Sequence, residues 1–236
     1  MKEDLKIFNE YYENFNTEEY GAYIKYDHTL KVVDIAKEIS DSLNLSEEDK
    51  DLAARCALWH DIARFNQWKE YKTFTDYYSF DHGKEGANIL QTLGIKDEII
   101  LKSTYYHNKY KIDDYLDDRT KLFCNITRDA DKIAIMIDHK IECSDNELLL
   151  TDDIINCFKE RKQLKNEYVI ENSTFHCLLR LIAFIFDINF KRSYEILKEQ
   201  DIINKKFDLV LNRFDDDRVK ELRDICNKYI EERISD

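Results

Sequence analysis

Apolar residues recur at spacings of three and four through most of the chain, which is the period of a buried stripe on an α-helix. The clearest example is residues 53–65, where Cys56, Trp59, His60 and Ala63 continue a stripe that begins at Leu52. This pattern predicts one amphipathic helix through most of the stretch, beginning after Ser46 as its N-cap residue. The helix carries a His60-Asp61 pair at the end of its apolar stripe.

The same pattern predicts helices along the rest of the chain. They are expected at about residues 3–15, 27–43, 81–93, 96–107, 119–140, 152–168, 173–190 and 216–233. Residues 66–81 and 108–118 lose the period and are predicted to form loops, the first with short turns. The chain has no proline and only four glycines, which argues against an all-β fold and against a glycine-rich phosphate loop. With no repeat or flexible linker, the sequence predicts a single all-α domain, residues 1–236.

Composition narrows the class of protein. Hydrophobic residues at 43% and charged residues at 36% are typical of a soluble globular protein, and a net charge of −13 argues against general nucleic-acid binding. The acidic N-terminus is not a signal peptide, and the longest apolar run, residues 177–186, is too short to span a bilayer. Six scattered cysteines without a CxxC pair indicate buried thiols in a reducing compartment. We therefore expect a cytoplasmic protein without membrane association.

Polar residues with metal-binding chemistry lie on or beside the apolar stripes of separate predicted helices. They are His28, His60, Asp61, His82, His107 and Asp131. A buried imidazole or carboxylate needs a partner, which can be a hydrogen bond in the core or a metal ion. Several helices that each direct such a side chain inward favour a metal centre of the kind that helical bundles build. Mixed imidazole and carboxylate ligands suit Fe, Mn, Co, Ni or Zn.

The order of these residues, H…HD…H…H…D, resembles that of the HD-domain superfamily of metal-dependent phosphohydrolases. The resemblance is carried by the stretches YDHTLKVVDIA, ALWHDIARF, FDHGKEGANIL, YYHNKY and RDADKI. It implies an HD-domain helical bundle at about residues 23–140, followed by additional C-terminal helices at about residues 147–233.

The resemblance also implies a set of metal ligands. Those implied for one ion are His28, His60, Asp61 and Asp131. The further histidines, His82 and His107, look like those of the family members with two metal ions, in which Asp61 bridges the ions. Asp129 is an alternative to Asp131, which we prefer because the ligand directly precedes a basic residue in the family's pattern. The implied cofactor is a divalent transition metal, with two ions expected.

Such a site suits the hydrolysis of a phosphate ester, because metal ions bind phosphoryl oxygens and lower the pKa of a bound water. Asp61 and Arg64 are the predicted catalytic residues. Arg64 follows the His-Asp pair by one turn and can bind the substrate phosphate, with a surface salt bridge as the alternative. Lys132 and Lys84 are weaker candidates for binding the phosphate, because each is also explained as a solvated helix residue.

Three functions agree with this reading of the sequence. The first is a phosphohydrolase whose partner is a small phosphorylated metabolite or nucleotide. The second is a di-iron oxygenase that cleaves C–C or C–P bonds, because the resemblance extends to such enzymes and they share the ligands. The third is a non-catalytic protein that binds a metal or a nucleotide, although all six ligand positions are filled. We expect the first, and the sequence leaves the substrate and the oligomeric state open.

Overall fold

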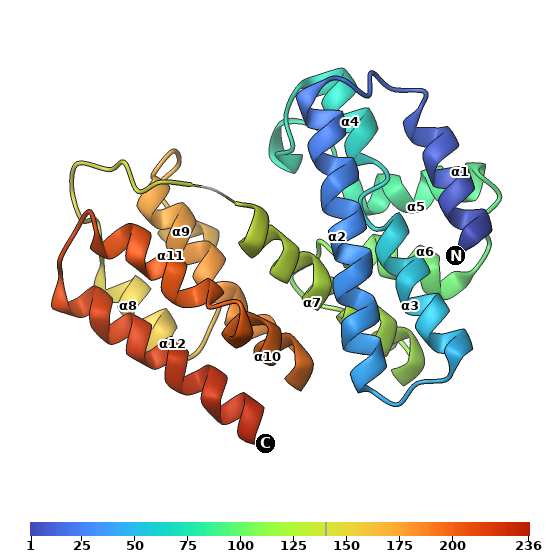
Figure 1. The fold of residues 1–236 in the computed structure, drawn as a ribbon. Helices are drawn as coiled ribbons and strands as arrows, with labels where there is room; N and C mark the ends of the chain where they lie inside the picture. The colour runs from blue at the N-terminus through green and yellow to red at the C-terminus, as the bar shows by residue number, and fades with distance from the viewer. Residues whose placement is uncertain (140) are drawn as a thin grey trace. The chain divides into compact units, whose positions relative to one another are not determined.

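The computed structural model describes residues 1–139 and 141–236, which form an α-helical protein (Figure 1). None of the described residues lies in a β-strand, so the prediction of an all-α fold is confirmed. Contacts between Cα atoms divide the chain into two compact units, unit 1 (Met1–Ala134) and unit 2 (Ile135–Asp236). A single domain with a core at about residues 23–140 and an extension at about 147–233 stays a prediction.

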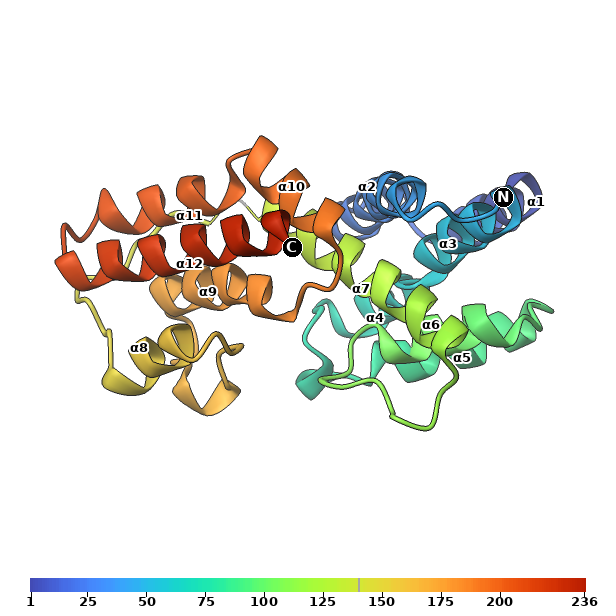
Figure 2. The same cartoon turned by 90° about the horizontal axis from the view of Figure 1, so that it is seen from below.

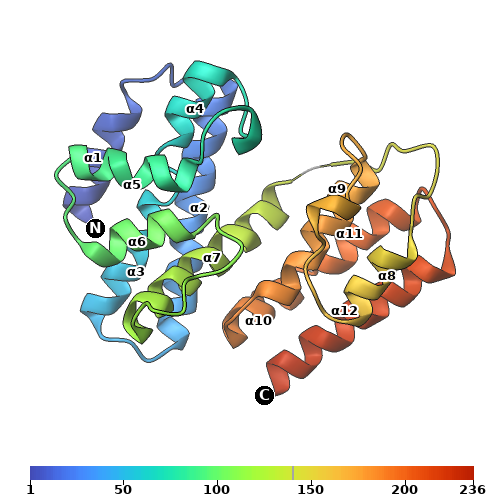
Figure 3. The ribbon, with the colours of Figure 1, turned by 180° about the vertical axis from the view of Figure 1, so that it is seen from behind.

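Unit 1 is built from helices that pack in pairs. They are α1 (Lys2–Tyr12), α2 (Tyr20–Ser42), α3 (Glu47–Trp59), α4 (Arg64–Tyr71), α5 (His82–Thr92), α6 (Glu98–Tyr106) and the first part of α7 (Asp118–Asp138). A single 3₁₀ turn, η1 (Asp76–Tyr78), lies between α4 and α5. Helix α2 packs against α3 and α4, while α6 packs against α3 and α5 (Figures 1 and 3). The core of unit 1 lies between these pairs.

The predicted helix over residues 53–65 ends earlier than its apolar stripe. As expected, α3 begins after Ser46, whose hydroxyl accepts the N–H of Asp49. The helix stops at Trp59, and His60 and Asp61 lie in a turn that precedes α4. The stripe continues through this turn because Ile62 and Ala63 are also fully buried, so apolar spacing alone does not reveal the break.

The prediction of a loop throughout residues 66–81 was wrong for its first part, because α4 continues to Tyr71. Gln67 is fully buried on this helix beside the buried Phe65. A buried polar residue interrupts the hydrophobic period, so the sequence pattern of α4 does not indicate a helix. The rest of the stretch contains η1, as the predicted short turns suggest.

Unit 2 contains the C-terminal helices. They are α8 (Asp152–Lys159), α9 (Thr174–Ile182), α10 (Lys191–Glu199), α11 (Ile202–Leu211) and α12 (Asp217–Ser235). Helix α11 packs against α9 and α12, as Figures 1 and 2 show. Helix α9 is shorter than the predicted helix over 173–190, because residues 183–187 continue as the 3₁₀ turn η3 and Ile188 is extended. The predicted helix over 119–140 corresponds to α7, and its last residue, Lys140, lies outside the described residues.

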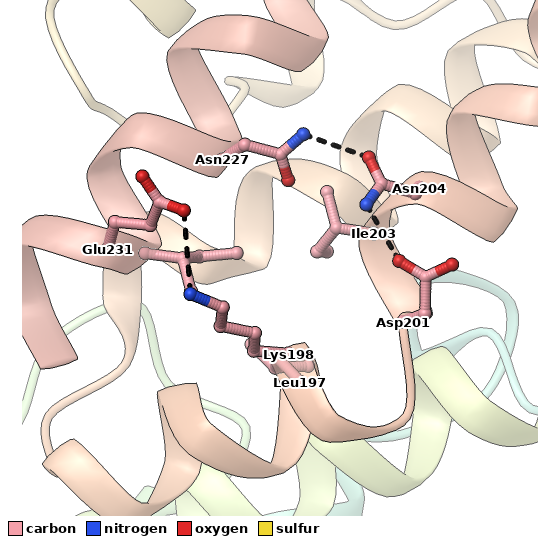
Figure 4. Close-up of a pocket in the computed structure, with 8 residues that line it drawn as sticks. Leu197, Lys198, Asp201, Ile203, Asn204, Asn227 and Glu231 are labelled. Atoms are coloured by element: carbon pink, nitrogen blue, oxygen red, sulfur yellow. Dashed lines mark hydrogen bonds and ion pairs between the residues drawn. The ribbon is translucent and has the colours of Figure 1, made fainter.

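A pocket of about 340 Å³ lies among α10, α11 and α12 of unit 2 (Figure 4). Its lining consists of Leu197, Lys198, Asp201, Ile203, Asn204, Asn227, Ile230 and Glu231. The amide of Asn227 donates to Asn204, whose own amide donates to Asp201 (Figure 4). These hydrogen bonds connect α12 to the start of α11.

The structure bears on two features of the sequence, its apolar stretches and its cysteines. No helix among the described residues has the length and apolarity to cross a membrane. All six cysteines are free thiols, and four of them, Cys56, Cys124, Cys157 and Cys226, are buried.

A buried carboxylate joins α1 to α3. Asp4 is 6% exposed, and its Oδ1 accepts hydrogen bonds from Arg55 at 3.0 Å and from the indole of Trp59 at 3.1 Å. Burial by itself raises the pKa of Asp4, but the hydrogen bonds from Trp59 and Arg55 outweigh it and hold the pKa below its usual value. Asp4 therefore stabilises the fold in its ionised form.

Asp4→Asn is expected to lower the free energy of unfolding by about 1–3 kcal/mol at pH 7, because it weakens both hydrogen bonds to a charged acceptor. A folded-state pKa below the unfolded value of about 3.9 means that this stabilisation is complete above that value. It is lost as the pH falls through the folded-state pKa. Urea unfolding of both proteins between pH 3 and pH 7 measures the difference, and a difference that grows on acidification would contradict the assignment.

Candidate metal centre

The six predicted ligands all lie in unit 1, on helix faces or at helix ends. His28 lies on α2, His60 caps α3, Asp61 lies in the turn before α4, His82 begins α5, His107 caps α6, and Asp131 lies on α7. They form two groups of three, which are His28, His60 and Asp131, and Asp61, His82 and His107. Within each group the potential ligand atoms lie within 4.8 Å of one another. The structure thus brings the predicted residues together, and their role as ligands stays a prediction.

Helix ends fix the rings of two histidines. The Nδ1 atom of His60 lies 2.7 Å from the carbonyl oxygen of Ala57, and that of His107 lies 2.6 Å from the carbonyl oxygen of Thr104. Because a carbonyl oxygen can only accept a hydrogen bond, each Nδ1 carries the proton and donates it. With Nδ1 as the only protonated nitrogen of a ring, its Nε2 atom carries a lone pair, which is the form that binds a metal ion.

A carboxylate fixes the third ring. The Nδ1 atom of His82 lies 2.7 and 2.6 Å from the two carboxylate oxygens of Asp76. Burial and the nearby Arg64 lower the pKa of His82 to about 4, although Asp76 acts in the opposite direction. The ring is therefore neutral at pH 7, with its proton on Nδ1. Its Nε2 atom lies 3.5 Å from Oδ1 of Asp61.

Asp76 is itself held in place by several donors. Its carboxylate accepts hydrogen bonds from Arg64 at 3.1 Å, from Gln67 at 3.0 Å and from Asn108 at 3.1 Å. Burial alone would raise the pKa of Asp76, but the hydrogen bond from His82 and the charge of Arg64 hold it well below its usual value. Asp76 is thus an ionised acceptor that orients His82 from outside the two groups.

Asp131 lies between the two histidines of the first group. Its Oδ1 atom lies 3.0 Å from Nε2 of His28 and 3.6 Å from Nε2 of His60. Burial alone would raise the pKa of Asp131, but interactions with His28 and then His60 hold it well below its usual value. The alternative ligand, Asp129, is fully buried but belongs to neither group. The two aspartates are two positions apart on α7 and therefore leave the helix in different directions.

Asp61 connects the two groups through different oxygens. Its Oδ1 atom lies 3.5 Å from Nε2 of His82 and 3.4 Å from Nε2 of His107. Its Oδ2 atom lies 3.5 Å from Nε2 of His60, which belongs to the first group. One carboxylate therefore faces both sets of donors, which is the arrangement required of a bridging ligand.

Two cations neutralise Asp61. The ammonium of Lys25 lies 2.8 Å from Oδ2, and Nε of Arg64 lies 3.3 Å from Oδ1. The carboxylate is only 3% exposed, and burial by itself would raise its pKa. Interactions with Lys25, His60 and Arg64 outweigh burial and hold the pKa of Asp61 well below its usual value. Asp61 is thus ionised in a nearly water-free position.

Two features fit a metal ion better than a core of satisfied hydrogen bonds. The buried Nε2 atom of His60 has no hydrogen-bond partner among the described residues, which costs about 1–3 kcal/mol when nothing compensates it. The Nε2 atoms of His82 and His107 lie 2.9 Å apart, and when both rings carry their proton on Nδ1 alone, two lone pairs face each other. Two lone pairs at this distance repel unless they share a cation. Four imidazoles and two carboxylates therefore form a donor set that fits transition-metal ions.

The three basic residues predicted to bind the substrate phosphate lie in different surroundings. Arg64 contacts Asp61, and its Nη1 atom also donates to the carbonyl oxygen of Phe74 at 2.6 Å. Lys132 is buried on α7. Lys84 is exposed and follows His82 by two residues, which is about 200° around α5. The phosphate-binding roles of these three residues stay predictions.

Sequence reasoning missed several residues that surround the two groups. They are Lys25, Gln67, Asp76 and Asn108. Lys25 precedes His28 by three positions on α2, but it lies before the helix predicted over residues 27–43, so its position on the same face was not recognised. Asp76 lies in the stretch predicted as a loop, where no periodic pattern indicates which side chains point inward.

Comparison with known proteins gives one family. The family model described as HD domain matches residues 26–136. The matched region contains all six residues of the two groups and lies mostly in unit 1. No curated protein and no solved structure matches the chain.

Proposed function

We propose that this chain, which belongs to the HD-domain superfamily through residues 26–136, is a metal-dependent phosphohydrolase. The proposed substrate is a small phosphorylated metabolite or nucleotide, cleaved as a phosphomonoester or a phosphodiester. The observation that carries the proposal is the position of Asp61, whose two oxygens face two separate sets of buried nitrogen and oxygen donors. Adjacent metal sites that share a carboxylate are suited to phosphoester hydrolysis.

The residues that would hold metal are those of the two groups. They are His28, His60 and Asp131 for one ion and Asp61, His82 and His107 for the other, with Asp61 shared. Divalent Fe, Mn, Co, Ni or Zn bound there would supply a Lewis acid for a phosphoryl oxygen and a water of lowered pKa. A mixed imidazole and carboxylate set does not select among these metals by itself.

The residues of the chain prepare the site for this chemistry. The backbone at Ala57 and Thr104 keeps the protons of His60 and His107 on Nδ1, so that Nε2 faces inward. Asp61 supplies negative charge in a position that water barely reaches. Because charges interact more strongly where water is excluded, this burial strengthens the attraction of Asp61 for cations.

The proposal also includes the kind of partner and the location of the protein in the cell. A net charge of −13 supports a small-molecule partner over general nucleic-acid binding. The six free cysteines support a cytoplasmic location, where thiols stay reduced.

The proposal is tested on full-length protein purified without a chelator or a nickel column. We expect close to two transition-metal ions per chain and release of phosphate, or of alcohol from a diester, under anaerobic conditions. Iron with oxygen uptake and no anaerobic hydrolysis would support the oxygenase alternative. Absence of metal, with no change in melting temperature on adding Mn²⁺, Fe²⁺, Co²⁺ or Zn²⁺, would overturn the metal centre and leave a helical binding protein.

A further inference from the structure

Lys25 is a cation inside the candidate site that neither the sequence pattern nor the family match assigns to a role. It lies on α2, one turn before His28, and its side chain is 16% exposed. Its ammonium lies 2.8 Å from Oδ2 of Asp61 and 5.2 Å from the centre of the Phe74 ring. Within residues 1–139 and 141–236, Asp61 is the one hydrogen-bond partner of this ammonium.

Arg64, the other cation on Asp61, is tied to its surroundings far more extensively. Its Nη1 atom donates to Gln67 at 2.6 Å, to the carbonyl oxygen of Phe74 at 2.6 Å and to Asp76 at 3.1 Å. Moving Arg64 toward a substrate would break several hydrogen bonds in a poorly exposed position, whereas moving Lys25 would break one. Lys25 is therefore the cation that can change partner at low cost.

The oxygen that Lys25 contacts is also the one that a metal ion of the first group would use. Oδ2 of Asp61 faces Nε2 of His60, while Oδ1 faces His82 and His107. An ammonium and a divalent ion beside the same buried oxygen repel each other strongly. Lys25 would therefore compete with a metal ion bound at the first group for Asp61, and its ammonium would then need another anion.

We propose that Lys25 binds the phosphoryl group of the substrate after a metal ion has displaced it from Asp61. The inference rests on the proposed function, because it takes a phosphate ester as the substrate. Lys25 pairs with Asp61 in the metal-free protein, which keeps the buried carboxylate neutralised. In the metal-loaded protein its three donors are available for phosphoryl oxygens. Arg64 then keeps the role of holding Asp61 and Asp76 in position.

The test compares Lys25→Met with wild type in two binding measurements on the full chain. Calorimetric titration of Mn²⁺ into metal-free protein is expected to give an affinity about tenfold higher for Lys25→Met, because the competing cation is gone. Titration of inorganic phosphate into the Mn²⁺-loaded protein is expected to give an affinity at least about tenfold lower, because a charge-assisted contact is lost. Lys25→Arg keeps the charge and is expected to retain phosphate binding within about threefold.

The matched control is Lys37→Met. Lys37 lies on the same helix, about 18 Å further along at 1.5 Å per residue, and pairs with Asp34 at 3.2 Å. The Lys37→Met variant loses the same charge as Lys25→Met and is expected to leave the affinities for Mn²⁺ and for phosphate unchanged. Equal phosphate affinity of Lys25→Met and wild type, or Mn²⁺ binding that is no tighter, would overturn the inference. If both affinities change as expected but no phosphate ester is hydrolysed, the inference about Lys25 stands and the proposed hydrolase activity fails.

Discussion

Asp61→Asn is expected to lower kcat for phosphoester hydrolysis by about 10³-fold or more, because the shared ligand supports both groups of donors. Asparagine offers one carbonyl oxygen, and its amide nitrogen does not bind a metal ion. The substitution also removes the charge that neutralises Lys25 and Arg64, so we expect the melting temperature to fall. Phosphate release by protein supplied with Mn²⁺, at matched folded concentration, measures the effect.

His107→Gln keeps the charge of Asp61 and its two cations, and serves as a second variant if Asp61→Asn folds poorly. It removes one imidazole from the second group and is expected to lose most activity with a smaller loss of stability. Asp97→Asn is the matched control, because Asp97 caps α6 through the N–H groups of Ile99 and Ile100 and asparagine caps as well. Wild-type activity in folded Asp61→Asn and His107→Gln would remove the proposed site.

Asp76→Ala is expected to weaken metal binding by about 10–100-fold, which is the usual effect of removing a partner that orients a histidine ligand. The His82 ring loses the acceptor that keeps its proton on Nδ1. Because the pKa of His82 is about 4, the ring is neutral with or without Asp76 above about pH 6. The ratio of the Mn²⁺ affinity of wild type to that of Asp76→Ala is therefore expected to be the same at pH 6 and pH 8.

Asp76→Asn retains a carbonyl acceptor and is expected to give an intermediate affinity, which a purely structural role of Asp76 would not predict. Asp34→Ala removes an exposed carboxylate from α2 and is the control for the change in net charge. A ratio that varies strongly between pH 6 and pH 8 would instead indicate that Asp76 controls the charge of His82.

Sequence reasoning predicted the six inward residues well because each lies on or beside the apolar stripe of a helix. His28 lies inside the long helix α2, where the period places it on the buried side, whereas Asp131 on α7 was preferred to the fully buried Asp129 from the family's pattern. The fold class followed from the same period and from the absence of proline. The family match over residues 26–136 agrees with this fold class.

The surroundings of the site were less accessible to prediction, for physical reasons. Gln67 is buried and forms hydrogen bonds with Asp76 and Arg64. Because this buried residue is polar, the hydrophobic period does not identify the inner face of α4. Asp76 acts on His82 from a 3₁₀ turn, and a turn has no period that places its side chains. Lys25 reads as a solvated lysine in the sequence, and only the tertiary contact with Asp61 distinguishes it.

The contacts of the Nδ1 atoms of His60, His82 and His107 differ in how easily a substitution can alter them. His60 and His107 are oriented by main-chain carbonyl groups, which every residue type at Ala57 or Thr104 would supply. His82 is oriented by the side chain of Asp76, which a single substitution can replace. Sequence drift can therefore adjust the basicity of one ligand while the other two stay constant. If the two groups bind metal as proposed, the second group is the one whose metal preference would diverge without loss of the fold.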